Sequence, residues 1–162
     1  MSCRFGFGYD IHRFAPGRRF VLGGVHLQSE LGLEGHSDAD VLLHAICDAL
    51  LGAAALGDIG NQYPNTDPRF KDISSLTLLS MVKDLLFKSR YSVANIDSTV
   101  VLEAPKIASF IPAMRKNISE SLNLSVAQIS VKATTHERLG SLGRGEGCAA
   151  FAVAALRFLD QE

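Results

Sequence analysis

Aromatic residues alternate with small or polar residues in the N-terminal segment of the chain. One side of an extended backbone would carry Phe5, Phe7 and Tyr9, and the other side would carry Gly6, Gly8, Asp10 and His12. Successive side chains of a strand point to opposite faces, so a period of two indicates a strand. We place this first strand at residues 3–9, followed by a loop.

The remaining pattern divides into further strands, three helices and polar loops. Strands are predicted at 19–27, 94–103, 128–134 and 148–158, helices at 38–55, 74–89 and 105–122, and loops at 28–36, 57–73 and 140–147. A glycine pair interrupts the strand at 19–27, which suggests a bulge or turn. The mixture predicts an α+β fold, a single-domain sandwich over 1–162 with one mixed β-sheet and helices packed on one face.

Local signals suggest where the helices begin. Ser37 is predicted as the N-cap of the first helix, with Asp40 at the N3 position. Pro105 fits the first turn of the third helix, and Pro112 would kink that helix. The loop at 57–73 is about 17 residues long, which favours a functional or mobile segment.

Composition excludes several classes of partner. The 162 residues include 16 Lys and Arg against 17 Asp and Glu, so no strong basic field is available for nucleic acid. The longest apolar stretch, 45–56, is too short to cross a membrane. Three widely spaced cysteines match no zinc pattern and indicate reduced thiols. With no signal or transit segment seen, we expect a cytoplasmic, bacterial location.

Asp10 and His12 are the first candidate metal ligands. Two residues apart on a strand, they present a carboxylate and an imidazole to the same side. A surface pair is the alternative interpretation. His44 lies on the first predicted helix with Asp40 and Asp48 one turn away on either side. That stripe is either a solvated face or a third ligand whose other ring nitrogen is held by an aspartate. Three protein ligands and an open position suit catalytic zinc, and the same set also suits Mn or Fe.

Three further segments carry side chains or backbone groups that could contact phosphate or a nucleotide. His36 and Ser37 precede a helix and could bind an anion, or they could be a cap with an incidental histidine. The run 132–147 contains hydroxyls, four glycines near Arg144, and Glu137, which is a natural ligand for Mg²⁺ beside phosphates; it could equally be a turn between strands. The run 103–108 could contact a base or simply start a helix.

Four motifs together resemble one family. They are G-Y-D-I-H-R-F at 8–14, G-H-S-D-A-D-V-L-L-H-A at 35–45, the run at 48–60, and the run at 132–147 with T-T-H-E-R-L-G-S-L-G-R-G-E-G. The chain is similar along nearly its whole length to the 2-C-methyl-D-erythritol 2,4-cyclodiphosphate synthase family of the non-mevalonate isoprenoid pathway. The resemblance implies a homotrimer whose active sites lie between subunits.

The resemblance also implies a reaction and its cofactors. The substrate would be 4-diphosphocytidyl-2-C-methyl-D-erythritol 2-phosphate, whose 2-phosphate attacks the β-phosphate, so that CMP leaves and the cyclic diphosphate closes. Asp10, His12 and His44 would bind Zn²⁺, one per subunit, and Glu137 would hold Mg²⁺ or Mn²⁺. His36 and Thr135 would stabilise the transition state, and Asp48 would orient a zinc-ligand histidine from behind. An isoprenoid diphosphate could bind on the trimer axis near Arg144 and Glu146.

The family's substrate contacts map onto several segments of the chain. They comprise Asp10, His12, His36, Ser37, Asp58, Ile59, Gly60, Tyr63, Pro64, Asn65, Thr66, Asp67, Leu102, Glu103, Ala104, Pro105, Lys106, Ile107, Ala108, Thr134, Thr135, His136, Glu137, Ser141 and Arg144. Residues 58–60 and 63–67 would bind the methylerythritol, and 102–108 would form the cytidine pocket of the neighbouring subunit. The chain departs from the family at Asn65, where many members have Asp, and at Ser141, where many have an aromatic residue.

Two other functions are compatible with the same residues. A zinc phosphoesterase would hydrolyse a nucleotide diphosphate, because zinc-bound water can attack phosphate. A non-catalytic trimer would bind an isoprenoid phosphate without releasing CMP. The nature of the product distinguishes the three.

Overall fold

The computed structural model describes residues 3–159, which contain a five-stranded mixed sheet. Its strand order is β4-β1-β7-β5-β6, from β1 (Cys3–Pro16), β4 (Leu31–Leu33), β5 (Tyr91–Val101), β6 (Ile129–Thr134) and β7 (Gly147–Phe158). Only the β5–β6 pair is parallel among these neighbours. A separate hairpin joins β2 (Phe20–Leu22) to β3 (Val25–Leu27).

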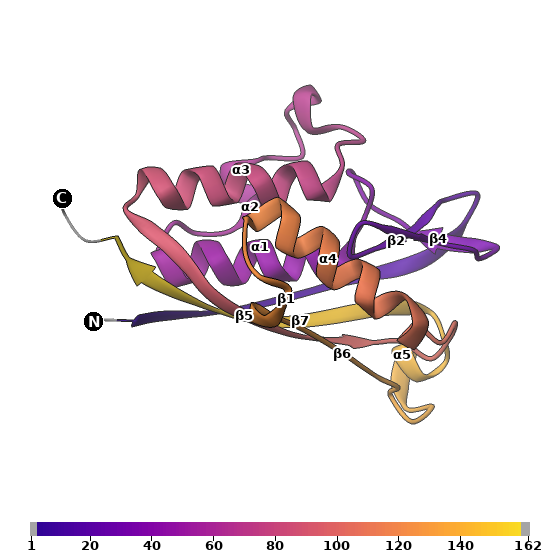
Figure 1. Ribbon diagram of the computed structural model, residues 1–162. Helices are drawn as coiled ribbons and strands as arrows, with labels where there is room; N and C mark the ends of the chain where they lie inside the picture. Colours follow the sequence, from indigo (N-terminus) through magenta and orange to yellow (C-terminus); the bar gives the residue numbers. More distant parts are fainter. Residues whose placement is uncertain (1–2, 160–162) are drawn as a thin grey trace.

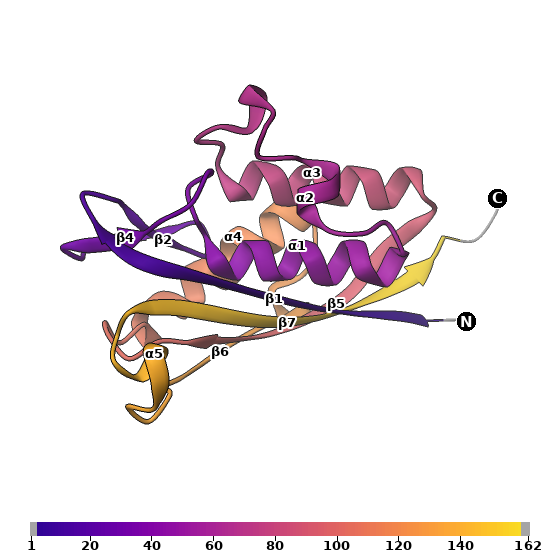
Figure 2. The same ribbon diagram turned by 180° about the vertical axis from the view of Figure 1, so that it is seen from behind.

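Three long helices cover one face of this sheet (Figures 1 and 2). They are α1 (Val41–Ala54), α3 (Ser75–Lys88) and α4 (Ile111–Leu122); the short helices are α2 (Ile59–Gln62) and α5 (Gly140–Gly143), with 3₁₀ turns η1 (Pro68–Phe70), η2 (Ala108–Phe110) and η3 (Val126–Gln128). This arrangement confirms the predicted α+β class and the placement of helices on one face. No helix within residues 3–159 is long and apolar enough to cross a membrane.

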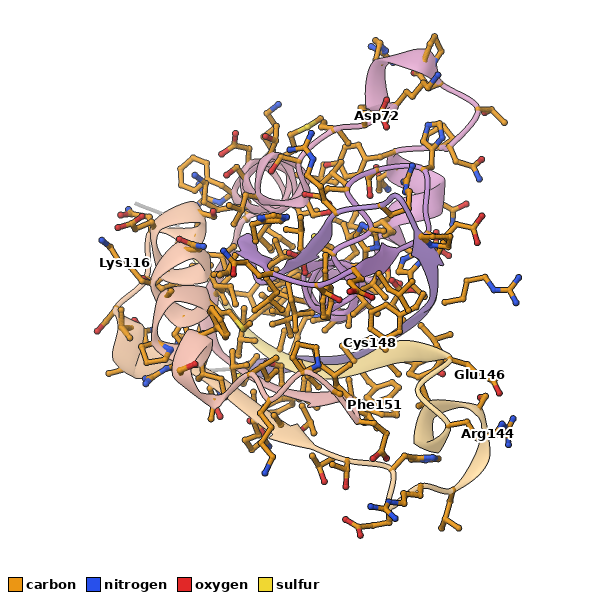
Figure 3. The ribbon with its side chains drawn as sticks, turned by 90° about the vertical axis from the view of Figure 1, so that its right-hand side faces the viewer. Asp72, Lys116, Arg144, Glu146, Cys148 and Phe151 are labelled. Atoms are coloured by element: carbon orange, nitrogen blue, oxygen red, sulfur yellow. The ribbon has the colours of Figure 1, made fainter. Side chains whose placement is uncertain are left out.

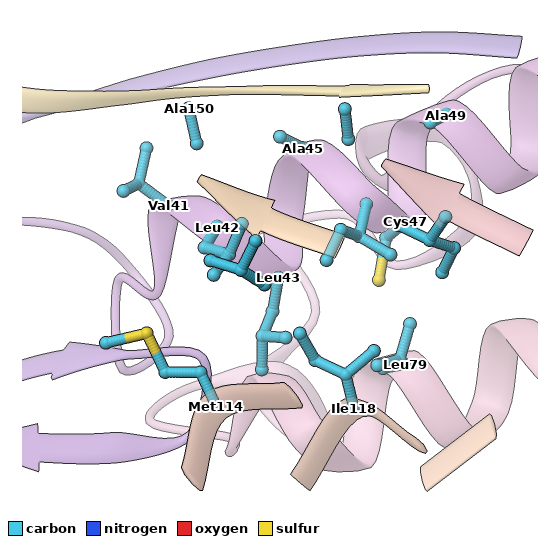
Figure 4. Packing of buried hydrophobic residues seen from close by; sticks show 14 of the residues in the cluster. Val41, Leu42, Leu43, Ala45, Cys47, Ala49, Leu79, Met114, Ile118 and Ala150 are labelled. Atoms are coloured by element: carbon cyan, nitrogen blue, oxygen red, sulfur yellow. The ribbon is translucent and has the colours of Figure 1, made fainter. Parts of the chain in front are cut away.

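Helix α1 lies in the centre of the core, where it packs on β1 and β7 and against α3, while α4 packs on β6 and α3. It is apolar nearly all round, which is typical of a buried helix. Figure 4 shows small side chains such as Ala45 and Ala49 toward the sheet, and Leu43 toward Met114 and Ile118. Small residues toward the strands and large ones toward the helices let α1 fill the space between both layers.

Strand β1 and helix α1 approach closely because two glycines face the helix. A Cβ atom on Gly6 would lie 2.0 Å from Ala49 O, and one on Gly8 would lie 1.9 Å from Ala45 O. Neither position has room for a side chain. The alternation seen in the sequence therefore has a steric cause: on the helix-facing side of β1, glycines at positions 6 and 8 are followed by Asp10 and His12.

The N-terminal third of the chain differs from its prediction in several places. β1 continues to Pro16 rather than ending at residue 9, because β7 and then β4 pair with its second half. The predicted strand at 19–27 is the hairpin β2–β3, which turns at a pair of glycines with positive φ. The predicted loop 28–36 contains β4.

Two predicted helix starts are wrong. The N-cap of α1 is Asp40 rather than Ser37, since the Asp40 carboxylate accepts the Leu43 N–H at 3.1 Å. Pro105 lies before the 3₁₀ turn η2 and α4 and so belongs to neither. Pro112 lies in the first turn of α4 instead of kinking it. A proline has no N–H to donate, and a first turn needs none, so Pro112 fits the start of this helix.

Candidate metal centre

Two elements bring three potential metal ligands to one point. Asp10 and His12 lie two residues apart on β1, and His44 lies in the second turn of α1. Asp10 Oδ2 is 3.0 Å from His12 Nε2 and 3.0 Å from His44 Nδ1. The two imidazole nitrogens are 3.2 Å apart. One carboxylate oxygen and two imidazole nitrogens that converge in this way are a suitable donor set for zinc with an open fourth position.

The close contact of β1 with α1 places His44 beside the strand. Ala45, which contacts Gly8, is the next residue along the helix. His44 is consequently buried, whereas Asp10 and His12 remain partly exposed. The interpretation of residues 40, 44 and 48 as a solvated face is wrong, since His44 and Asp40 are both buried.

The three side chains influence one another's ionisation. Burial disfavours the charged form of Asp10, but hydrogen bonds with His12 and His44 outweigh it and hold the pKa of this carboxyl well below its usual range. Burial likewise disfavours a charged His12, yet the hydrogen bond and charge of Asp10 raise the pKa of that imidazole. The cluster therefore favours an ionised carboxylate, which is the form that binds a metal.

The outer nitrogen of His44 contacts two hydroxyl groups. Its Nε2 lies 3.0 Å from Ser37 Oγ and 3.0 Å from Ser75 Oγ. Asp48, which the resemblance suggested would orient a zinc-ligand histidine, accepts the Ile59 N–H at 2.8 Å through one carboxylate oxygen and so fastens the start of α2. Ser75 was not among the predicted residues, because no local motif links it to a histidine 31 positions earlier.

A cavity of about 350 Å³ adjoins the three ligands. Its walls come from β1, the loop before α1, α1, the 57–73 segment and α3. They comprise Asp10, His12, His36, Ser37, His44, Ile59, Gly60, Tyr63, Asn65, Phe70, Ile73 and Leu78. All except the last three belong to the predicted site. Those three form an apolar wall that resembles ordinary core residues in the sequence, so chemistry-based reasoning had no signal for them.

The rest of the 57–73 segment lies outside this lining. Asp58 caps α2 by accepting the Asn61 N–H at 2.8 Å, and its side chain is exposed. Asp67 caps η1 and pairs with Arg69 at 2.6 Å. Pro64 and Thr66 also lie outside the cavity lining. Ser141 lines a different cavity of about 520 Å³, which His12 borders from the other end.

A second group of predicted residues gathers at the ends of β5 and β6. Leu102 N–H donates to Thr134 O at 3.0 Å, and Glu103 Oε1 accepts the backbone N–H of His136 at 2.8 Å. Thr135 Oγ1 donates to Glu137 Oε1 at 2.7 Å. The segment 104–108 follows Glu103 directly, with Ile107 buried in the core. None of these residues lines the cavity beside Asp10, so within the described part of one chain the predicted site is divided in two.

A sequence model of the YgbB family matches residues 3–157. This chain belongs to the YgbB family. A relative from Pelodictyon phaeoclathratiforme, named 2-C-methyl-D-erythritol 2,4-cyclodiphosphate synthase, is 58% identical over 96% of this chain and 99% of its own. A protein of the same name from Chlorobium phaeobacteroides is 59% identical over 95% of this chain and 98% of its own.

Solved structures of similar proteins have the same fold. The bifunctional IspDF of Campylobacter jejuni aligns with a TM-score of 0.94 and 43% identity over 98% of this chain, which spans 43% of that longer protein. IspF of Plasmodium falciparum, solved as a CDP complex, aligns with a TM-score of 0.86 and 34% identity over 98% of both chains. The likeness confirms the family resemblance drawn from the four motifs.

Proposed function

We propose that this YgbB-family chain converts 4-diphosphocytidyl-2-C-methyl-D-erythritol 2-phosphate to 2-C-methyl-D-erythritol 2,4-cyclodiphosphate and CMP. The observation that carries this proposal is the convergence of Asp10, His12 and His44 at the edge of a cavity, in a chain 58% identical to a named synthase. In the reaction, an oxygen of the 2-phosphate forms a bond to the β-phosphorus, and the bond from that phosphorus to the CMP oxygen breaks.

Such a reaction requires two anionic groups to be brought together. Positioning and charge stabilisation therefore contribute most of the rate enhancement. His36 and Ser37 line the cavity beside the metal ligands, where both side chains can donate hydrogen bonds to phosphate oxygens. Zinc held by Asp10, His12 and His44 would supply a Lewis acid for a phosphate oxygen. We expect the apolar wall of Phe70, Ile73 and Leu78 to disfavour water beside the reacting phosphates and so to favour cyclisation over hydrolysis.

We assign the methylerythritol end of the substrate to the 57–73 side of the cavity. Ile59, Gly60, Tyr63 and Asn65 form that side. Asn65 keeps a carbonyl oxygen and adds an N–H donor where many family members have a carboxylate. Asp58 stays in the proposal as a ligand for the sugar hydroxyls, since its exposed carboxylate retains an oxygen beyond the one that caps α2.

The cytidine end of the substrate is assigned to 102–108 and to the loop that follows β6. Glu103 joins these segments through its bonds to the backbone of residues 136 and 138. Glu137 presents a carboxylate that would hold Mg²⁺ or Mn²⁺ beside the diphosphate, and Thr135, whose hydroxyl donates to that carboxylate, would stabilise the transition state. Thr134 and Arg144 complete this half of the proposed site.

A homotrimer would unite the two halves across a subunit interface. Support comes from the face of the sheet opposite the helices, where large apolar side chains are exposed. They are Phe5, Phe7, Tyr9, Ile11, Phe151 and Val153, which we call the β1–β7 apolar face. Figure 3 shows Phe151 on the side of β7 away from the helices. An exposed apolar surface of this kind is typical of a protein interface.

Other expectations remain proposals. Arg144 and Glu146 pair with each other after α5, at the edge of the molecule in Figure 3, and they are the residues that would contact an isoprenoid diphosphate on a trimer axis.

A cytoplasmic location agrees with the three free cysteines.

Phosphorus NMR of the reaction products tests the proposed function. The zinc- and magnesium-loaded protein should convert the diphosphocytidyl substrate to a cyclic diphosphate and one equivalent of CMP. Linear phosphates beside CMP would show the phosphoesterase instead. Substrate that is bound but unchanged, with both metals present, would show the non-catalytic binder.

A further inference from the structure

Ser75 and Asp38 form a chain of polar contacts behind His44. Ser75 Oγ lies 3.0 Å from His44 Nε2 and donates to Asp38 Oδ1 at 2.5 Å. Asp38 Oδ2 accepts the backbone N–H of Ser75 at 3.0 Å. Ser75 is fully buried, so its hydroxyl has no access to water. None of the metal, substrate or transition-state roles assigned above uses either residue.

The carboxylate sets the direction of these hydrogen bonds. A carboxylate can only accept, and a serine hydroxyl has a single proton. Because Ser75 gives that proton to Asp38, its oxygen can only accept from His44, so the ring proton belongs on Nε2. The opposite nitrogen, Nδ1, is then the one with a free lone pair, and it faces Asp10 and His12.

The Asp38 carboxylate also caps the start of α3. α3 begins at Ser75, and its N-cap residue Ser74 makes no side-chain capping bond. The Asp38 carboxylate takes that place by accepting the first N–H of the helix, where the helix dipole favours negative charge. Asp38 itself is held by its backbone N–H, which donates to Ile73 O at 3.2 Å. The cap of α3 and the contact with His44 therefore depend on one carboxylate.

Ser37 completes the surroundings of His44 Nε2. Its oxygen accepts the Ala39 N–H at 3.3 Å and lies 3.0 Å from Nε2, so it can share the ring proton with Ser75. Ser37 then keeps its own proton, and it lines the cavity beside the metal ligands. The arrangement leaves the Ser37 hydroxyl available as a donor to an anion there.

We propose that Asp38 and Ser75 are positioning residues that keep the His44 proton on Nε2 and thereby prepare Nδ1 as a zinc ligand. This inference rests on the zinc site of the proposed function. It adds two residues that touch neither substrate nor metal. Partners behind a metal-bound histidine typically contribute about 10–100-fold to metal affinity.

Zinc affinity of the full chain, measured by competition with a chelating indicator, tests the proposal. Ser75→Ala should weaken zinc binding roughly 10–100-fold. Ser80→Ala is the matched control, because Ser80 lies on the same helix and its hydroxyl donates to Leu76 O of that helix at 3.1 Å. Zinc affinity should be unchanged in this control. Ser75→Ala with zinc affinity within twofold of the parent would overturn the proposal.

Asp38→Asn tests the direction of the hydrogen bonds. Asp38 Oδ2 accepts the Ser75 backbone N–H at 3.0 Å, whereas Oδ1 accepts the Asp40 N–H only at 3.4 Å. The amide oxygen therefore takes the Oδ2 position, and the amide NH₂ faces Ser75 Oγ and donates to it. The hydroxyl proton of Ser75 must then point toward His44 Nε2. Two protons that face each other repel, so the His44 ring proton is no longer favoured on Nε2. Zinc affinity should fall at least as far as in Ser75→Ala. If Asp38 and Ser75 only filled space next to His44, this nearly isosteric change would leave zinc affinity unaltered. That result would overturn the proposal.

The His44 ring proton gives a readout that is independent of activity. In the zinc-loaded parent, the Nε2–H signal should be visible by NMR and protected from exchange with solvent. Ser75→Ala and Asp38→Asn should lose that protection, and Ser80→Ala should keep it. Parent protein that binds no zinc would refute the metal site of the proposed function, whereas zinc binding with unaltered protection in both variants would refute the positioning role alone.

Discussion

Asp10 Oδ2 lies 3.0 Å from His44 Nδ1, although 34 residues separate the two along the chain. His44 comes from a helix and Asp10 from a strand, and glycines on that strand allow the helix to lie directly against it. The metal centre is therefore a product of helix–strand packing. Changes to the packing should affect metal binding as directly as changes to the ligands.

Removal of one ligand should abolish the metal centre without unfolding the chain. His44→Ala leaves one carboxylate and one imidazole, so zinc affinity should fall by more than the roughly 10–100-fold that an outer partner contributes. Inductively coupled plasma mass spectrometry should find no stoichiometric zinc, and CMP release should cease. The proposed trimer should persist. Full zinc occupancy in this variant would show that His44 is not a ligand.

Chelation of the metal should destabilise the parent protein by a predictable amount. A ligand that binds only the folded state stabilises it by about 2.7 kcal/mol at 100 times its dissociation constant. The melting temperature should therefore rise with free zinc and drop on addition of a chelator. In His44→Ala the melting temperature should not respond to zinc, and an equal response in both proteins would mean that zinc binds elsewhere.

Gly8→Ala should disturb both the fold and the metal centre. The added Cβ would lie 1.9 Å from Ala45 O, so α1 must move away from β1. Overpacking of this kind typically costs about 1–3 kcal/mol, and a backbone atom cannot turn aside as a side chain can. Chemical denaturation should show that loss, accompanied by weaker zinc binding because His44 moves with the helix.

Gly52→Ala provides the control for that substitution. A Cβ at Gly52, in the same helix, would meet only Phe7 O at 3.9 Å. Alanine is favoured over glycine within a helix by about 1 kcal/mol, so this variant should be neutral or more stable. A Gly8→Ala protein as stable as Gly52→Ala would contradict the steric role of Gly8.

Local sequence patterns predicted the elements that carry the metal ligands. The period of two placed Asp10 and His12 on one face of β1, and the apolar run around His44 indicated a helix. Both signals are local, so they need no knowledge of tertiary contacts. That His44 approaches Asp10 depended on the family motifs, because periodicity alone left a solvated helix face open as an alternative.

Long-range contacts account for what the sequence could not predict. Ser75 reaches His44 only because the segment at 72–75 is fastened to residues 36–38 by backbone bonds between different loops. Pro105 and Pro112 are both possible first-turn prolines, and α4 begins at Ile111 after the 3₁₀ turn Ala108–Phe110, so Pro112 takes this place. No local propensity distinguishes such choices.

The metal-free protein should show a pH-dependent stability from Asp10 and His12. Burial opposes both charges, but their mutual hydrogen bond lowers the pKa of Asp10 and raises that of His12. The contribution of Asp10 is present above its unfolded pKa of about 3.9 and is lost as pH falls through the folded value. The contribution of His12 is complete below about pH 6.5 and is lost as pH rises through its folded pKa.

His12→Gln should remove the pH-dependent stabilisation that His12 contributes to the metal-free protein, so it is measured in the presence of a chelator. Its melting temperature should differ most from the parent's at about pH 5–6, between the two unfolded pKa values, and the gap should narrow toward pH 9. Differential scanning calorimetry across this range measures the gap. A difference that widens above pH 7 would contradict the raised pKa of His12.

Disruption of the β1–β7 apolar face should prevent assembly of the proposed trimer and leave zinc binding intact. Phe7 is 63% exposed on that face, and its ring lies 6.3 Å from that of Phe151. Phe7→Asp would place a charge in the proposed trimer interface, so light scattering should report a monomer. CMP release should be lost, because the 102–108 region of a neighbouring subunit is then missing.

Zinc should still bind to the Phe7→Asp protein, since Asp10, His12 and His44 come from one chain. Phe87→Asp is the matched control: Phe87 is 67% exposed but lies on α3, away from the β1–β7 apolar face. That variant should remain a trimer with unchanged CMP release. A Phe7→Asp protein that stays trimeric would place the interface elsewhere, whereas a monomer with full CMP release would show that each chain holds a complete site.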